Sequence, residues 1–343
     1  MSTINEIKNY VKVCCKTHLV PFIQGSPGLG KSAVIREIAE ENSLELIDIR
    51  LSQCDPSDLM GFPKLDGETA TYVPMDIFPT ENTKLPKDKN GKDKNGWIIF
   101  FDELNSAPKS VQVCAYKIIL DRMVGQHKLH DKVWICCAGN LATDKAVVNN
   151  LSTALRSRLV NLTMEPSVND WLEYAINKDF HFTITAYIQC KGIDALYNFN
   201  PDKDSDTYAC PRTWEMLNRI VNYVNDPKEY LDLVLGTVGS IGAEYLGFIE
   251  YCGSIPTLAD VLSGNAKVPG KEGVKFLTCN WLLKELTELT KDSEITKVME
   301  YIEKFSEEYC GLFLQSASKK NPKVLNNKGY LKLLTKLGKF LVC

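Results

Sequence analysis

Residues 25–32 read GSPGLGKS, and the spacing of glycines, lysine and serine within this stretch is that of a phosphate-binding loop. Glycines let several backbone N–H groups point at phosphate oxygens, the lysine adds a positive charge, and the serine hydroxyl is a ligand for Mg²⁺. A strand-like run, VPFIQ, precedes the loop, and an amphipathic helical pattern follows it, with its N-terminal dipole facing the anion. We therefore predict a nucleotide-phosphate site formed by Gly25, Ser26, Pro27, Gly28, Leu29, Gly30, Lys31 and Ser32.

A second polar cluster follows the apolar run WIIFF at residues 97–101, which predicts a buried strand. Asp102 and Glu103 come directly after it, at the carboxyl end, where ligands bind in parallel sheets. We predict that Asp102, together with Ser32, holds Mg²⁺ through its water shell. Glu103 is then the expected base that polarises the attacking water.

A third polar residue closes another apolar run, VWICCAG at residues 133–139. Asn140 follows it directly, and an amide can hydrogen-bond both a γ-phosphate oxygen and the attacking water without adding charge. An asparagine at a strand end is by itself only a turn residue. Asn140 is therefore informative as the third member of a set.

Strand-like and helix-like segments alternate from Val20 to about Met164, which is typical of an α/β layer with a mainly parallel sheet. The expected strands are residues 20–24, 44–51, 97–101, 133–139 and 159–164. After Pro166 apolar residues recur at helical spacing without clear strands, which predicts a helical second domain.

Composition narrows the class of protein. The 343 residues predict two or three domains, and a net charge of −3 gives no general reason to expect nucleic-acid binding. The N-terminus does not read as a signal peptide, and the apolar segment 230–249 contains Asp232 and Glu244, so we expect no membrane span and a cytoplasmic location. The 12 cysteines include adjacent pairs and no Cys-x-x-Cys, which favours reduced thiols over disulfides or structural zinc.

With these motifs the chain resembles the AAA+ ATPases, and more narrowly their MoxR-like branch, a helix-2-insert group that includes the dynein-related type. The resemblance lies in GSPGLGKS, DELNSAP, CAGN, LRSRL and CPRTWEML, in the family's order, and covers about residues 18–265. It implies ATP and Mg²⁺ as cofactors. It also implies that Arg158 is an arginine finger for the neighbouring subunit's nucleotide, with Arg156 as second choice, and that Arg212 is the sensor 2 arginine. Ser106 and Leu159 depart from the branch, which often has arginine and phenylalanine there.

The resemblance also orders the chain into domains. Residues 1–165 are expected to form the nucleotide-binding domain, with a helix-2 insert at about 55–80 and a pre-sensor hairpin at about 121–134. A helical lid is expected at 166–265 and a helical C-terminal extension at 274–343. The predicted fold class is thus α/β: a P-loop NTPase core with a parallel sheet flanked by helices, followed by an all-helical lid domain and the extension.

The function implied by the resemblance is that of a homo-oligomeric ring, expected to be a hexamer, which couples Mg-ATP hydrolysis to remodelling of a partner protein. MoxR-like chaperones often act with a protein that carries a von Willebrand factor A domain, so a partner of this kind and a protein substrate are implied. Nucleic acid is not favoured as a partner.

Two other classes stay open. A nucleic-acid motor or restriction-type nucleotidase related to McrB would need a basic pore, and the lysines near the insert have little aromatic interleaving; they are Lys84, Lys87, Lys89, Lys92 and Lys94. A nucleotide-dependent scaffold without hydrolysis is the other class, and Glu103 and Arg158 argue against it.

The chain from Gly311 onward has no acidic residue and is rich in lysine. A solvated helix face and a docking surface for an acidic partner both fit this pattern. The lysines are Lys319, Lys320, Lys323, Lys328, Lys332, Lys336 and Lys339.

Overall fold

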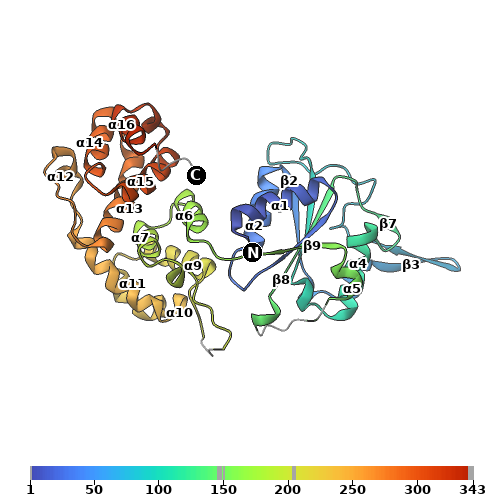
Figure 1. Cartoon of the computed structure of the whole chain (residues 1–343). Coiled ribbons are helices and arrows are strands. Elements are labelled where there is room, and N and C mark those ends of the chain that lie inside the picture. The colour runs from blue at the N-terminus through green and yellow to red at the C-terminus, as the bar shows by residue number, and fades with distance from the viewer. Residues whose placement is uncertain (1, 145–148, 150, 203–205, 339–343) are drawn as a thin grey trace. The chain divides into compact units, whose positions relative to one another are not determined.

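The computed structural model describes residues 2–144, 149, 151–202 and 206–338. Its internal contacts separate two units: unit 1 runs up to residue 165 and includes 200–202, and unit 2 comprises the remaining described residues from 166 onward. Unit 1, coloured blue to green in Figure 1, is built on a five-stranded parallel sheet. The strand order is β2-β5-β8-β1-β9. The strands are β1 (Val20–Gln24), β2 (Leu44–Arg50), β5 (Gly96–Asp102), β8 (Val133–Gly139) and β9 (Leu159–Thr163).

Helices cover the sheet, which explains why its central strands are continuous apolar runs. Helices α1 (Ile4–Lys16) and α2 (Lys31–Glu41) contact strands of the sheet, while α4 (Lys109–Asp121) shares an apolar cluster with side chains of β1, β5 and β8. All seven residues of β5 are buried. The short helices α3 (Pro56–Met60) and α5 (Thr153–Arg156) complete the regular helices of unit 1. The predicted P-loop NTPase fold class is therefore confirmed.

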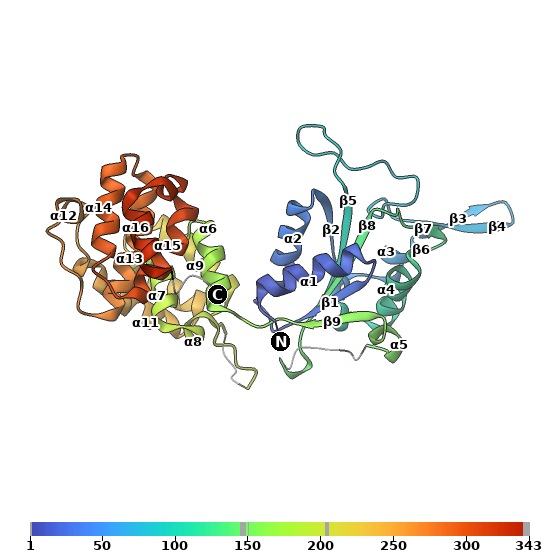
Figure 2. The same ribbon diagram turned by 45° about the horizontal axis from the view of Figure 1, so that its top comes forward.

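Unit 1 also contains two antiparallel hairpins, of which β3–β4 clearly projects outward (Figure 2). Strands β3 (Phe62–Asp66) and β4 (Thr69–Val73) turn at Gly67, where φ is 61°, a conformation typical of an Asp-Gly hairpin turn. Strands β6 (Met123–Val124) and β7 (His127–Lys128) form the second hairpin. The two hairpins touch, because the His127 Nε2 atom lies 2.9 Å from the Tyr72 carbonyl oxygen.

The regular secondary structure in the described residues of unit 2 is all helical, as the fold-class prediction required. One apolar cluster runs from Trp171 to Leu337, with Trp214 and Tyr245 fully buried. The boundary between a lid and an extension near residue 265 stays a prediction. The helices are α6 (Val168–Asn177), α7 (Phe182–Lys191), α8 (Ile193–Leu196), α9 (Pro211–Tyr223), α10 (Leu231–Val238), α11 (Ile241–Ile249), α12 (Leu258–Ser263), α13 (Glu272–Glu288), α14 (Asp292–Ile302), α15 (Glu307–Lys320) and α16 (Lys328–Leu337).

The apolar segment 230–249 folds as two short helices, α10 and α11, that pack against each other. They are separated at Gly239, where φ is 70°, a backbone conformation that favours glycine. A Cβ atom on Gly242 would lie 2.9 Å from Val234 Cγ1, so this glycine permits the close approach of the two helices. Among the described residues, no helix is both long and apolar enough to cross a membrane.

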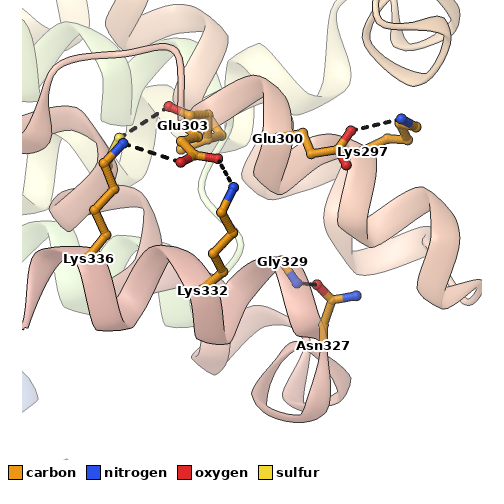
Figure 3. Close-up of polar contacts among 9 residues, drawn as sticks. Lys297, Glu300, Glu303, Asn327, Gly329, Lys332 and Lys336 are labelled. Carbon is orange, nitrogen blue, oxygen red and sulfur yellow. Dashed lines mark hydrogen bonds and ion pairs between the residues drawn. The ribbon is translucent and has the colours of Figure 1, made fainter.

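Several C-terminal lysines are neutralised within unit 2. Lys332 and Lys336 both bind the Glu303 carboxylate, at 3.0 and 3.2 Å (Figure 3). Hydrogen bonds from these two lysines lower the pKa of the Glu303 carboxyl. Lys319 pairs with Glu173 and Lys320 with Asp179. These four lysines therefore belong to internal ion pairs, which favours the solvated-face interpretation; Lys339 lies outside the described residues.

Candidate active site

The loop between β1 and α2 has the backbone of a phosphate cradle. Gly28 and Gly30 have φ values of 82° and 93°, and Gly30 is the N-cap of α2. Leu29 is 2% exposed and anchors the loop in the interior. The Gly25 N–H donates to the Gly139 carbonyl at 3.3 Å, which extends the pairing of β1 and β8 into the loop.

The Lys31 ammonium lies inside this loop rather than in solvent. It donates to the carbonyl oxygens of Gly25 at 2.6 Å and Ser26 at 3.1 Å, and its third contact is Asn140 Oδ1 at 3.3 Å. Lys31 is 9% exposed. Because a buried ammonium needs compensating partners, a phosphate oxygen is a natural replacement for these neutral acceptors.

Ser32 and Asp102 form an oxygen pair beside the lysine. The Ser32 hydroxyl donates to Asp102 Oδ2 at 3.0 Å, while Asp102 Oδ1 accepts the Glu103 backbone N–H at 2.9 Å. Asp102 is 8% exposed. A hydroxyl and a carboxylate are the hard oxygen donors that Mg²⁺ takes alongside nucleotide phosphates, so this pair fits the predicted ion. No group of three or more metal-binding side chains, such as a zinc site, occurs within the described ranges.

Glu103 has an unusual backbone conformation, and both oxygens of its carboxylate have partners. Its φ is 57°, in the left-handed region that non-glycine residues rarely adopt. Oε2 accepts a hydrogen bond from the Ser52 hydroxyl, and the Arg50 Nε atom lies 3.6 Å from Oε1. Strand β2 pairs with β5 with Arg50 opposite Asp102, which brings both partners to this edge of the sheet.

Asp48 adds a further acidic group on β2. Burial first, and then the charge of Asp102, raise the pKa of its carboxyl, while Arg36 and Arg50 lower it. The net direction is upward, and the contribution of Asp102 shows that these two carboxylates repel each other. A divalent cation would relieve this repulsion.

Asn140 is fixed through its backbone. Asn105 Nδ2 donates to the Asn140 carbonyl oxygen at 2.7 Å, and Asn105 Oδ1 accepts the Asn140 N–H at 3.1 Å. Ser26 also contacts the segment that follows, since its hydroxyl donates to Asp144 Oδ1 at 3.0 Å.

Two of the predicted arginines, Arg156 and Arg158, lie outside this cluster of unit 1. Arg156 and Arg158 are exposed, and Arg158 donates to the Ala154 carbonyl oxygen at 3.1 Å and to the Tyr116 hydroxyl at 3.4 Å. No acidic side chain in the described part of the chain forms an ion pair with either one. Arg212 is exposed on the first turn of α9, after Pro211 at the helix start, and belongs to unit 2.

The structure thus brings together the loop, Ser32, Asp102, Glu103 and Asn140, all at the carboxyl ends of β1, β5 and β8. The sequence analysis missed Ser52, Arg50 and Asn105 as residues of this site. The sequence shows polar residues at or just beyond the ends of β2 and β5. Only the order of the strands in the sheet shows that these two strand ends are neighbours.

Comparison with known proteins agrees with this geometry. Residues 22–164 match the family model described as "ATPase family associated with various cellular activities (AAA)". The chain carries an AAA ATPase domain. The presence of this domain supports ATP hydrolase activity for this part of the chain. No curated protein sequence matches the chain.

Solved structures similar to this chain are distant from it in sequence. One is an ATPase candidate from Cytophaga hutchinsonii, with 14% identity, a TM-score of 0.37 and coverage of 96% of this chain and 79% of that one. Another is NtrX from Brucella abortus in complex with ATP, with 14% identity, a TM-score of 0.39 and coverage of 98% and 68%. The ADP complex of NtrX gives 13% identity, a TM-score of 0.37 and coverage of 97% and 68%.

Proposed function

We propose that this AAA ATPase is the subunit of a MoxR-like ring, expected to be a hexamer, that uses Mg-ATP hydrolysis to remodel a partner protein. The observation that carries the proposal is the convergence of Lys31, the Ser32–Asp102 pair, Glu103 and Asn140 at one edge of the sheet. Each of these groups has a distinct task in phosphoryl transfer to water.

In this proposal Lys31 exchanges its carbonyl partners for phosphate oxygens, and the backbone N–H groups of residues 25–30 bind the remaining oxygens. Ser32 and Asp102 hold Mg²⁺, which when bound neutralises charge on the phosphates. Glu103 accepts the proton of the attacking water, which requires a carboxylate oxygen released from Ser52 or Arg50. The Asn140 amide orients the water or the terminal phosphate.

The position of Arg158 supports an assembly in which subunits complete one another's sites. Leu159 pairs with Val20 and Thr163 with Gln24, so Arg158 precedes the amino end of β9 while the phosphate loop follows the carboxyl end of β1. Five strand residues separate these edges by about 16 Å. The exposed Arg158 guanidinium at the opposite edge therefore suits an arginine finger that enters a neighbouring subunit's site, and Arg156 is the alternative. Arg212 is proposed as the sensor 2 arginine, which contacts the nucleotide of its own subunit.

The hairpins supply a candidate surface for the remodelled protein. Every residue of β3 and β4 is exposed, and large apolar side chains are among them: Phe62, Leu65, Tyr72 and Val73 are 55%, 79%, 38% and 46% exposed. Apolar groups left in water on a projecting hairpin favour transient contact with a polypeptide. This supports a protein client over a nucleic-acid motor, and one lysine of the neighbouring loop, Lys94, is already paired with Glu45. A partner bearing a von Willebrand factor A domain remains what the resemblance implies.

Two measurements test the proposal. Light scattering of Glu103→Gln with Mg-ATP should give one defined multimer mass, and a monomer under conditions of full wild-type turnover would overturn the ring. A photo-crosslinking residue at Leu65 should capture polypeptide in the ATP-bound Glu103→Gln form, whereas the same residue at Val113, which is 69% exposed on α4, should not. Salt-dependent stimulation of turnover by DNA, without crosslinks at Leu65, would instead support the McrB-related alternative.

A further inference from the structure

Asn105 makes a two-way bond to the backbone of Asn140. Its Nδ2 donates to the Asn140 carbonyl oxygen at 2.7 Å and its Oδ1 accepts the Asn140 N–H at 3.1 Å. A carboxamide is suited to this pairing because it carries a donor and an acceptor side by side. Both backbone polar groups of Asn140 are therefore engaged just beyond the end of β8.

The packing around this bond leaves little freedom. Asn105 is 3% exposed, and a Cβ atom added to Gly139 would lie 2.2 Å from Asn105 Oδ1 and 2.8 Å from Phe22 Cζ. The last residue of β8 must therefore be glycine for the amide to reach the backbone of the next residue. Such closeness fixes the direction in which the Asn140 side chain leaves the chain.

The same short turn carries Glu103 and Asn105. Residues 104–106 form a 3₁₀ turn in which Ser106 N–H donates to the Glu103 carbonyl at 2.9 Å, and Ala107 N–H does so at 3.1 Å. A residue downstream of Asn140 also contacts this turn, because the Asn149 N–H donates to the Asn105 carbonyl oxygen at 2.6 Å. The predicted base and the predicted amide are thus linked through one rigid turn rather than through the sheet alone.

We infer that Asn105 is a positioning residue for hydrolysis, which holds the Asn140 amide in register with the Glu103 carboxylate. The inference rests on the proposed roles of Glu103 and Asn140. In this role Asn105 acts through the backbone of Asn140. Since small misplacements of catalytic groups cost about 100-fold in rate, loss of the bond should lower kcat and spare nucleotide binding.

The test is Asn105→Asp, which keeps the shape and the acceptor but replaces the donor with an oxygen that faces the Asn140 carbonyl. We expect kcat for ATP to fall by about 10-fold to 100-fold, while the nucleotide Kd changes little. Because the buried carboxylate faces a carbonyl oxygen, the Tm should fall as well, so kcat is measured well below the transition. The matched control is Asn95→Asp, since Asn95 Nδ2 donates to the Asn42 carbonyl at 2.8 Å beside the amino end of β5, away from the site. Asn105→Ser, which is smaller and retains a hydroxyl, is the second variant if the carboxylate prevents folding.

A double-mutant comparison tests the positioning role of Asn105 separately from the proposed role of Asn140. In an Asn140→Ala background, Asn105→Asp should lower kcat no further, because its route of action is gone. If Asn140→Ala lowers kcat but Asn105→Asp and Asn105→Ser do not, or if their losses add to that of Asn140→Ala, the positioning role is wrong. If Asn140→Ala itself leaves kcat unchanged, the proposed role of Asn140 fails instead, and the positioning role with it. A lower Tm with unchanged kcat below the transition would show a purely structural residue.

Discussion

Ser52 donates a hydrogen bond to the Glu103 carboxylate across the ends of two neighbouring strands, although 51 positions separate them in the chain. The Arg50 guanidinium engages the other carboxylate oxygen at 3.6 Å. Both oxygens of the proposed base are therefore occupied. Water activation requires at least one of them to be released, so the contact with Ser52 opposes hydrolysis in this arrangement.

Ser52→Ala should raise basal ATP turnover. A hydrogen bond to a charged group is worth about 1.5 kcal/mol or more when buried and less at this half-buried site, so we expect an increase of about 3-fold to 10-fold in kcat. Steady-state ATPase assays measure it, with the exposed Ser110→Ala as control. A decrease in kcat would mean that Ser52 aligns the base rather than restraining it.

Glu103→Gln should stop hydrolysis and preserve ATP binding. Glutamine keeps an oxygen that can accept from Ser52 but cannot take a proton from water, so single-turnover rates should fall by about 10² to 10⁴. Glu40→Gln, an exposed change on α2, is the matched control. A variant that hydrolyses ATP at the normal rate would remove Glu103 from the proposed mechanism.

Lys31→Ala should abolish measurable ATP binding. The ammonium is held within the loop by Gly25 and Ser26 and is the loop's one charged side chain, so alanine removes its main attraction for phosphate. Isothermal calorimetry measures the Kd. Lys12→Ala, which breaks only the exposed pair with Glu41, should leave the affinity within about two-fold. Wild-type affinity in Lys31→Ala would contradict the phosphate-loop assignment.

The sheet and the loop were predictable because buried parallel strands are uninterrupted apolar runs. The predicted runs 20–24 and 133–139 coincide with β1 and β8, and 97–101 lies one residue inside β5 at each end. Polar residues that end such strands meet at one edge, which is why Asp102 and Asn140 could be placed together from sequence.

Contacts between residues distant in sequence were not predictable. The bond from Ser52 to Glu103 depends on β2 lying next to β5, and a pattern of apolar residues does not state strand order. The same holds for the C-terminal lysines, whose partner Glu303 lies on another element than α16. A charge run in sequence shows the side chains but not the carboxylates that neutralise them.

Asn327→Ala should destabilise unit 2. Asn327 is fully buried, and its Oδ1 accepts the Gly329 N–H at the start of α16 (Figure 3). The same oxygen accepts the Tyr330 N–H, and Nδ2 donates to Asp292 and Thr296. Losing the cap and leaving these groups unpaired should cost about 2–4 kcal/mol. Hydrogen exchange of α14 and α16 in urea measures the loss.

The neighbouring Asn326 is exposed, so Asn326→Ala should change stability by less than about 0.5 kcal/mol. Asn327→Asp, which keeps the cap but not the donors to Asp292, should fall between the two. Equal exchange rates in Asn327→Ala and Asn326→Ala would show that the cap and its contacts contribute nothing.

Arg158→Ala should nearly silence hydrolysis and leave ATP binding close to normal. Arg158 lies beside the amino ends of the strands, so it cannot serve the phosphate loop at their carboxyl ends within its own subunit. A finger acting from a neighbour stabilises charge that develops in the transition state and is worth about 10³ to 10⁵ in rate. Arg156→Ala, an exposed arginine two positions earlier, is the matched comparison.

Mixing distinguishes a finger shared between subunits from one used internally. Arg158→Ala subunits keep an intact phosphate loop, and Lys31→Ala subunits keep an intact finger, so interfaces that pair them in the right order should recover activity that neither variant has alone. Subunit exchange is verified first with labelled subunits, and the recovered rate is then followed against the mixing ratio. Because each productive interface needs one subunit of each kind, activity should peak at intermediate ratios and vanish at both ends. If exchange occurs and no activity returns at any ratio, Arg158 is not the shared finger. Recovery when Arg156→Ala subunits are mixed with Lys31→Ala subunits would then assign that role to Arg156.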